Sequence, residues 1–269
     1  MKLGLYLRNM GPQSTVDTLL ACTRAAEQAG IDDLWVADHI AIPPDDAEGS
    51  GGRYLDPLAT LAFLAGITRR IGLGTGVLVL PYRPPLATAK WVATIQELSA
   101  GRLLLGIGAG WMEAEFRAVG VPRSRRSEIT DQTLAFLLRC FTQDEGEANG
   151  QRFLFRPRPA RPPIFVGGAP PQAIRRCALY GDGWMPMGND PTALRPFVEE
   201  LQERMTTAGR PNAEVAVITS LALDDRASAS DQIQRWAEIG ATRLVHASRY
   251  SDSAAFTRAA EALRGALPV

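Results

Sequence analysis

Short apolar runs alternate along the chain with longer segments in which apolar residues recur every three or four positions. The runs predict β-strands, and the longer segments predict amphipathic helices. Because the runs are apolar throughout, we expect parallel strands that are buried on both faces. Eight strands are predicted, at residues 2–7, 33–37, 71–80, 103–107, 164–166, 183–185, 214–223 and 243–246.

A helix is predicted after each strand. These helices span residues 16–29, 57–66, 85–99, 128–142, 171–180, 191–208, 229–239 and 253–267, and a short helix at residues 113–119 precedes the fourth. Eight strand–helix units in 269 residues predict an α/β protein, a single (β/α)8 TIM barrel in which residues 1–269 form one domain. A doubly wound open sheet is the alternative, because the same alternation builds both folds.

The stretch from Thr142 to Pro163 interrupts this alternation before the fifth strand. It is polar at first and then rich in proline. Asn149-Gly150 is typical of a tight hairpin turn. We therefore expect a small hairpin excursion at this point of the barrel.

Composition and charge limit the classes of partner. The 29 Lys and Arg residues balance the 29 Asp and Glu residues, which argues against a general nucleic-acid or membrane-surface binder. No apolar run approaches the roughly 20 residues of a membrane span. Cys22, Cys140 and Cys177 lie in predicted helices without ligand spacing, which favours buried thiols and no metal site. We expect a cytoplasmic protein that acts on a small-molecule substrate.

In a barrel of this kind, ligands bind at the carboxyl ends of the strands. His39 and His246, the two histidines of the chain, both follow predicted strands. An imidazole can exchange a proton near neutral pH, so His39, with Asp38 beside it, is a candidate catalytic residue. For His246, which directly follows an apolar strand, a structural role is the leading interpretation.

Glycines gather at three of the predicted strand ends, in Thr75-Gly76-Val77, Gly108-Ala109-Gly110 and Gly167-Gly168. They match neither a phosphate-binding P-loop nor a dinucleotide fingerprint. A flat ligand lying against the backbone is one interpretation, and glycines that only fit barrel corners are the other. Gly167-Gly168 precedes a predicted helix, whose first N–H groups favour phosphate. These positions together predict a phosphorylated ring cofactor.

Five motifs in chain order resemble the bacterial luciferase-like oxidoreductase superfamily. They are Gly30-x-Asp32-x-Leu34-Trp35-Val36-x-Asp38-His39, Gly72-Leu73-Gly74-Thr75-Gly76-Val77, Gly101-Arg102-x4-Gly106-x-Gly108-Ala109-Gly110-Trp111, Pro163-Ile164-Phe165-Val166-Gly167-Gly168 and Gly181-Asp182-Gly183-Trp184. The resemblance implies a barrel that binds flavin mononucleotide (FMN) or the deazaflavin coenzyme F420. The short chain and the Asp38-His39 pair are more similar to the F420-dependent branch.

The resemblance also implies roles for residues. In the F420-dependent branch the aspartate contacts the deazaflavin, and the histidine is the proton acceptor of sugar-phosphate dehydrogenases. A non-proline cis peptide and a bulge that back the ring are implied at Gly76-Val77. Where those dehydrogenases have a glutamate acid and a cofactor-binding asparagine, this chain has Trp111 and Ala114, so a different substrate is expected. The resemblance further implies a homodimer formed through the helices and loops around the second and third strands.

Three arginines lie in the loop from Val121 to Ser127. A solvated loop is one interpretation. The other is that Arg125 and Arg126 hold the anionic tail of F420 through charge-assisted hydrogen bonds.

The resemblance therefore implies an F420-dependent oxidoreductase that moves a hydride between the deazaflavin and a small organic substrate. His39 would donate or accept the proton, and Asp38 would orient it or contact the ring. An FMN-dependent monooxygenase that uses reduced flavin and O2 is the alternative, and a cofactor-free accessory subunit is a third possibility.

Overall fold

Nine parallel strands close a barrel of eight positions in the computed structural model, which describes residues 1–47 and 49–267. The strands are β1 (Lys2–Tyr6), β2 (Asp33–Val36), β3 (Gly72–Thr75), β4 (Leu78–Val79), β5 (Leu103–Gly108), β8 (Ile164–Gly167), β9 (Gly183–Met185), β10 (Glu214–Thr219) and β11 (Arg243–His246). Pairing of β1 with β11 and of β3 with β5 completes the ring. The barrel prediction is confirmed, and the open-sheet alternative is wrong.

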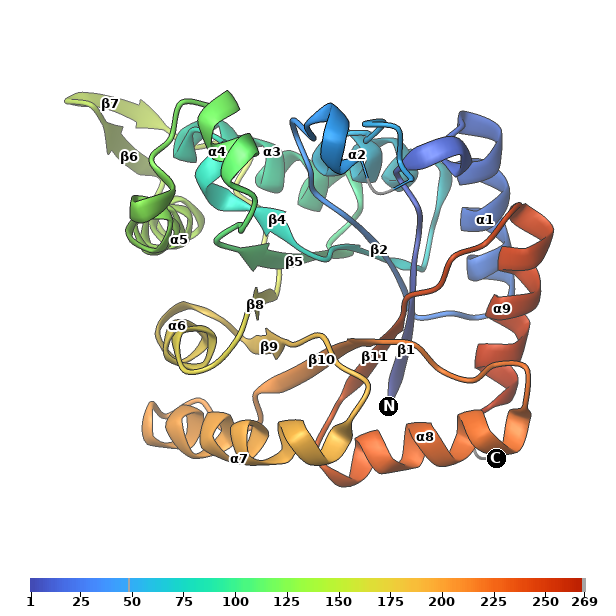
Figure 1. Ribbon diagram of the computed structural model, residues 1–269. Helices are drawn as coiled ribbons and strands as arrows, with labels where there is room; N and C mark the ends of the chain where they lie inside the picture. Colours follow the sequence, from blue (N-terminus) through green and yellow to red (C-terminus); the bar gives the residue numbers. More distant parts are fainter. Residues whose placement is uncertain (48, 268–269) are drawn as a thin grey trace.

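The helices surround the strands (Figure 1). They are α1 (Val16–Gln28), α2 (Pro57–Ile67), α3 (Pro85–Leu98), α4 (Glu113–Ala118), α5 (Arg126–Thr142), α6 (Gln172–Tyr180), α7 (Pro191–Thr207), α8 (Arg226–Glu238) and α9 (Ser253–Gly265). Short 3-10 turns span Gly11–Gln13, Pro44–Asp46, Leu80–Tyr82 and Arg123–Arg125. Aspartate side chains accept backbone N–H groups at the amino ends of α2, α7, α8 and α9, which explains where these helices begin.

The third predicted strand is interrupted. The sequence predicted one strand over residues 71–80, whereas β3 ends at Thr75 and β4 begins at Leu78, with both paired to β5. The Gly76–Val77 peptide between them is cis, as the resemblance implied. We call these two residues the bulge.

The barrel interior is filled by its own side chains. Those that form this inner cluster are Trp35, Phe165, Met185, Ala216, Ile218 and Val245. The Trp35 ring occupies the space beside Gly74, where an added Cβ would lie 2.3 Å from a ring carbon. This packing fills the barrel below the bulge, so we look for a ligand site at the carboxyl ends of the strands, which we call the mouth.

The excursion before the fifth strand position is a hairpin of β6 (Glu145–Ala148) and β7 (Gln151–Leu154). Asn149 and Gly150 form its turn with positive φ angles, as the sequence predicted. The hairpin extends away from the barrel beside α5 (Figure 1). Within residues 1–47 and 49–267, no helix is both long and apolar enough to cross a membrane.

Candidate active site

Every site residue that the sequence predicted at the carboxyl end of a strand lies at the mouth. Because the strands are parallel, their carboxyl ends meet at one end of the barrel. Thr75, Gly108 and Gly167 are the last residues of β3, β5 and β8. The residues that follow strands are Asp38 and His39 after β2, the bulge residues Gly76 and Val77 after β3, Ala109 and Gly110 after β5, and Gly168 after β8. Arg125 and Arg126 lie instead where α5 begins.

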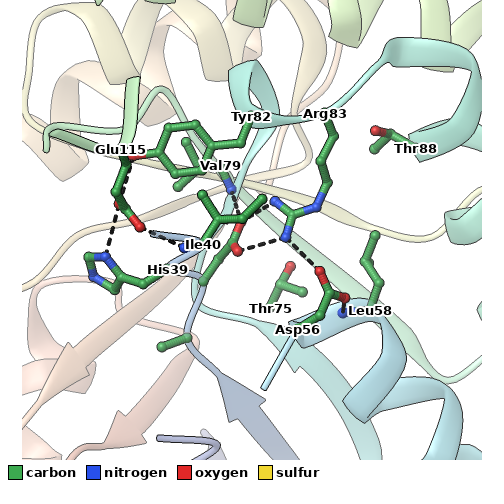
Figure 2. Close-up of polar contacts among 12 residues, drawn as sticks. His39, Ile40, Asp56, Leu58, Thr75, Val79, Tyr82, Arg83, Thr88 and Glu115 are labelled. Carbon is green, nitrogen blue, oxygen red and sulfur yellow. Dashed lines mark hydrogen bonds and ion pairs between the residues drawn. The ribbon is translucent and has the colours of Figure 1, made fainter. Parts of the chain in front are cut away.

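His39 is held by a buried carboxylate (Figure 2). Its Nδ1 lies 3.0 Å from an Oε atom of Glu115, whose side chain is 1% exposed, whereas that of His39 is 20% exposed. A carboxylate at Nδ1 fixes the orientation of the ring and favours the tautomer that carries its proton on Nδ1. The geometry thus makes Nε2 the atom suited to exchange a proton with a ligand.

Glu115 is itself fixed by three further donors. The backbone amides of Ile40 and Ala41 lie 2.6 Å and 3.0 Å from one carboxylate oxygen, and the Tyr82 hydroxyl donates to the other over 2.9 Å. Burial raises the pKa of Glu115, but the hydrogen bonds from His39, Ala41, Ile40 and Tyr82 outweigh it and lower this pKa to about 2. Glu115 is therefore an anion at neutral pH and favours a positive charge on the imidazole.

Local packing explains why α4 brings Glu115 to this place. The next residue, Phe116, is fully buried and packs edge to face against Tyr82, with ring centroids 5.1 Å apart. Gly110, with φ of +77°, lets the chain before α4 pass close to Val79 and Phe116. A Cβ added at Gly110 would lie 2.7 Å from Val79. Glu115 was not predicted from the sequence. The only signal is a carboxylate early in the helix that follows β5, and Glu113 gives the same signal.

Asp38 does not orient His39. Its carboxylate accepts the Val79 amide at 2.8 Å and both Nη atoms of Arg83, at 2.6 Å and 2.8 Å. Arg83 also pairs with Asp56, the residue that caps α2 (Figure 2). Burial raises the pKa of Asp38, and Arg83 offsets part of this effect. The orienting role predicted for Asp38 belongs to Glu115, and Asp38 instead ties the end of β2 to β4.

The bulge is held on several sides. The Tyr6 hydroxyl donates to the Gly76 carbonyl oxygen, and Thr75 Oγ1 donates to the Gly106 carbonyl oxygen at 2.6 Å. The Val77 side chain fits between two glycines, since an added Cβ would lie 2.6 Å from it at Gly108 and 2.8 Å at Gly167. These glycines make room first for the bulge itself. Their contact with a ring stays a prediction.

Gly168 differs from Gly167 in its surroundings. It has φ of +111°, and an added Cβ would meet only Ala173, at 3.9 Å. Trp184 Nε1 donates to its carbonyl oxygen at 3.0 Å, which fixes the turn that leads to α6. The first N–H groups of a helix lack partners within the helix. An anion can therefore approach the backbone at Gly168, where among the described residues only the Ala173 side chain lies within 4 Å of the added Cβ.

Arg125 and Arg126 differ in their partners. Arg125 is exposed and pairs with Glu128 at 2.9 Å. Arg126 is half-buried and donates to the Arg123 carbonyl oxygen, and no carboxylate among the described residues pairs with it. Of the two, Arg126 is the better placed to pair with a bound anion.

His246 is a buried hydrogen-bond acceptor. Its Nδ1 accepts the Leu221 amide at 3.0 Å, and burial lowers its pKa to about 4. β10 was predicted to end at Leu223 but ends at Thr219. Beyond Thr219 the backbone amides bond to side chains and not to a neighbouring strand, since Ser220 donates to Asn189 and Leu221 donates to His246. The structural role favoured for His246 agrees with this geometry.

The mouth also has an apolar and aromatic edge. The ring of Tyr54 lies 5.0 Å from that of His39, and the ring of Trp111 lies 6.1 Å from it in an edge-to-face arrangement. Ile40, Trp111 and Met187, which follow β2, β5 and β9, are exposed. Exposed apolar side chains at a strand-end site are suited to contact an apolar ligand.

Comparison with known proteins identifies the family. The model of the luciferase-like monooxygenase family matches residues 1–267. The chain belongs to this family. The luciferase-like family predicted from the five sequence motifs is thereby confirmed.

Relatives of this luciferase-like chain include both characterised and uncharacterised proteins. It is 32% identical over 260 residues to an uncharacterised protein of Mycobacterium tuberculosis, covering 88% of this chain and 90% of that one. It is 31% identical over 233 residues to the F420-dependent hydroxymycolic acid dehydrogenase of the same organism, covering 81% of this chain and 62% of that one.

Solved structures share the fold. The monooxygenase RslO1 from Streptomyces bottropensis superposes with a TM-score of 0.80 at 19% identity and covers 98% of this chain and 97% of its own. An F420-dependent secondary alcohol dehydrogenase bound to an F420–acetone adduct also superposes with a TM-score of 0.80, at 16% identity, and covers 99% of both chains. The luciferase-like family thus contains oxidoreductases and monooxygenases, and this chain is an enzyme of that kind.

Proposed function

We propose that this protein is an F420-dependent oxidoreductase, which transfers a hydride between coenzyme F420 and a small organic substrate. The contact of His39 with Glu115 at the mouth carries the proposal. The F420-dependent relatives support it, since one oxidises a hydroxymycolic acid and another a secondary alcohol, as their names state.

His39 moves the proton of the reaction. When bound, the deazaflavin supplies the hydride chemistry. As an alcohol carbon loses its hydride, His39 accepts the hydroxyl proton, and it returns a proton to the oxygen when a carbonyl is reduced. Glu115 keeps the ring oriented and stabilises the positive charge that His39 gains. Burial raises the pKa of Tyr82 far above neutrality, so its hydroxyl remains a donor to Glu115.

The bulge would support the flat ring. Gly76 and Val77 are partly exposed at the mouth, and Ala109 and Gly110 are partly exposed beside them. The carboxylate of Asp38 is fully engaged by Val79 and Arg83, so its contribution to cofactor binding is to hold β4, and with it the bulge, in place.

The cofactor's phosphate would lie at Gly168. The open space beside this glycine supports that position. Pro170 and Pro171 carry no N–H group and the Ala173 amide donates to Ala169, so the Gln172 amide at the first position of α6 would be the helix donor. Arg126, which lacks a carboxylate partner among the described residues, would bind the acidic tail in preference to Arg125.

An FMN-dependent monooxygenase that uses reduced flavin and O2 is the second candidate. The observation that favours it is the similarity to monooxygenases, namely RslO1 and the 4-hydroxyprotoasukamycin monooxygenase of Streptomyces nodosus subsp. asukaensis, which is 27% identical over 230 residues. The two candidates share the mouth and differ in the cofactor that it accepts.

A homodimer formed through α2 and α3 is part of the proposal. These helices pack side by side, and α2 carries no charged residue. Phe63 on α2 and Trp91 and Leu98 on α3 are exposed on their outer faces. Exposed apolar side chains on adjacent helices are suited to bury each other across a two-fold axis.

The proposal is tested by following loss of the visible absorbance of F420 with a panel of primary, secondary and cyclic alcohols. We expect the wild type to reduce the cofactor with at least one member of the panel. His39→Asn should lower that rate by about a hundredfold or more, because it removes the proton acceptor. A His39→Asn variant as fast as the wild type would refute the role of His39.

A further inference from the structure

Arg8 is a charged residue at the mouth that the proposed reaction does not use. It lies two residues beyond the end of β1. Leu3, Leu5 and Leu7 pack in the core between the barrel and its helices, whereas Tyr6 packs on the inner cluster. Side chains alternate along a strand, so Arg8 continues the inward row of Tyr6 one level nearer to the mouth.

The guanidinium of Arg8 pairs with no acidic residue among those that the structure describes. Its Nε is enclosed and makes no hydrogen bond to any described residue. The ion pairs within residues 1–47 and 49–267 do not include it. An enclosed donor on a charged group destabilises the protein unless an acceptor reaches it. The Nη1 and Nη2 atoms are not enclosed and make no hydrogen bond to a described residue, so an anion bound to them would offset the unpaired charge.

The chain around Arg8 is tied to the segments that carry His39 and Tyr54. The side-chain amide of Asn9 donates to the carbonyl oxygens of Ala37 and Leu55 at 2.8 Å, and its oxygen accepts the Ala37 amide at 3.0 Å. The next residue, Met10, pairs with Tyr54 in an antiparallel bridge. Arg8 therefore lies on the same side of the mouth as His39.

The proposed phosphate position lies on the other side. Going round the barrel from β1, the strands are β11, β10, β9 and then β8, which ends at Gly167. Four steps in a barrel of eight positions place β1 opposite β8. An anion at Arg8 is thus distinct from a phosphate at Gly168, and a cofactor anchored at Gly168 leaves Arg8 for the substrate.

We propose that Arg8 binds a carboxylate of the substrate, so that this enzyme acts on an alcohol or carbonyl compound that is also an acid. The Nη1–Nη2 edge of a guanidinium, which at Arg8 is not enclosed, matches the two oxygens of a planar carboxylate. The proposal rests on the function proposed above where it takes the substrate to be an alcohol or carbonyl compound with its reacting carbon at His39, whereas the carboxylate contact at Arg8 does not.

The test uses matched pairs of acids and amides as probes, namely phenylacetate with phenylacetamide and hexanoate with hexanamide. Their binding to the F420-loaded protein is measured by isothermal titration calorimetry. At least one acid should bind about tenfold more tightly than its amide or better, because a charge-assisted bidentate pair is lost with the amide. Equal binding of acid and amide in both pairs would overturn the proposal.

Variants assign the preference to Arg8. Arg8→Met should bind acid and amide within about twofold of each other. Arg249→Met is the matched control, since Arg249 is exposed and follows the neighbouring strand β11. It should keep the preference, and equal losses in both variants would show a general charge effect and overturn the proposal. If Arg8→Met does not fold, Arg8→Gln replaces it.

F420 titration of the same variants separates this proposal from the proposed function. Arg8→Met should bind F420 as the wild type does, whereas a tenfold loss would assign Arg8 to the cofactor tail and overturn the substrate role. If the wild type does not bind F420, the proposed function fails, and the acid–amide comparison on the protein alone still decides the role of Arg8.

Discussion

Glu115 is the residue on which the electrostatics of the mouth depends. It binds His39 on one side and two backbone amides of the segment that follows β2 on the other, so it fixes both the ring and the loop that carries it. Its side chain is almost fully buried. Only a carboxylate anion at this position can accept from all four neighbouring donors, which are His39, the Ile40 and Ala41 amides, and Tyr82. Replacing it should therefore affect stability as well as catalysis.

We expect Glu115→Gln to lower the free energy of unfolding by about 1–3 kcal/mol at neutral pH, because the amide cannot accept all four donors. The folded-state pKa near 2 lies below the ordinary value of 4.5, so the stability that Glu115 contributes is present above pH 4.5 and is lost as pH falls toward 2. The difference between variant and wild type should shrink over that range.

Denaturant unfolding at several pH values checks this prediction. Glu113→Gln is the matched control, since Glu113 is on the same helix and 55% exposed, and it should change stability by less than about 0.5 kcal/mol. Equal effects of the two substitutions would show that the Glu115 contacts contribute nothing specific.

We expect His246 to make the stability of the protein depend on pH. Its folded-state pKa near 4 lies below the ordinary 6.5, so the unfolded chain binds the proton first and stability falls as pH drops from 6.5 to 4. His246→Asn keeps an acceptor for the Leu221 amide but does not titrate, so its stability should fall less between about pH 7 and about pH 5. Denaturation midpoints at both pH values measure this, and equal slopes would contradict it.

The sequence predicted which residues reach the mouth but not how they pair. His39 follows an apolar strand, and this position alone places it at the rim. Glu115 and Glu113 are two residues apart in one short helix, and no pattern distinguishes the buried carboxylate from the exposed one. Arg83 escaped prediction for the same reason, because its partners Asp38 and Asp56 are brought together only by the fold.

At the scale of elements, the bulge and the ends of β5 and β8 form one packed unit. The Val77 side chain occupies the space that Gly108 and Gly167 leave open. The shape of the mouth therefore depends on the fit of one valine between two glycines on neighbouring strands. This fit can be tested without any ligand.

Gly108→Ala should destabilise the protein by about 1–3 kcal/mol, because the new methyl would lie 2.6 Å from Val77 Cγ2. The same substitution in a Val77→Ala background should cost much less, since the conflicting methyl is gone. Gly265→Ala, with open space around it, is the control and should be nearly neutral. Unfolding free energies of the double-mutant cycle measure the coupling, and additive effects would refute the packing account.

The sequence predicted the elements well, because periodicity and glycine or proline boundaries determine them locally. The exceptions are informative. The break at Gly76–Val77 follows from contacts with Tyr6 and with the neighbouring strands, and the end of β10 follows from side chains of Asn189 and His246. Both depend on residues far away in the chain, which periodicity does not report.

In the whole molecule, the eight-position barrel places His39, the proposed proton-exchanging residue, and the proposed phosphate position at different sides of one mouth. The outer surface bears the proposed dimer contact on α2 and α3. The two features are independent, so the oligomeric state can be tested separately.

We expect the wild type to elute as a dimer in size-exclusion chromatography with light scattering. Trp91→Glu should shift it toward the monomer, since a charge would be buried in the contact. Leu179→Glu, at an exposed apolar residue on α6, is the control and should leave the mass unchanged. A wild-type monomer, or equal effects of both substitutions, would contradict the α2–α3 contact.

A comparative titration decides whether this mouth accepts a deazaflavin, as we propose. The purified protein is titrated with F420 and with FMN, oxidised and reduced, under identical conditions. We expect F420 to bind at least about a hundredfold more tightly than either form of FMN. Tighter binding of FMN would refute the F420-dependent function and favour the monooxygenase.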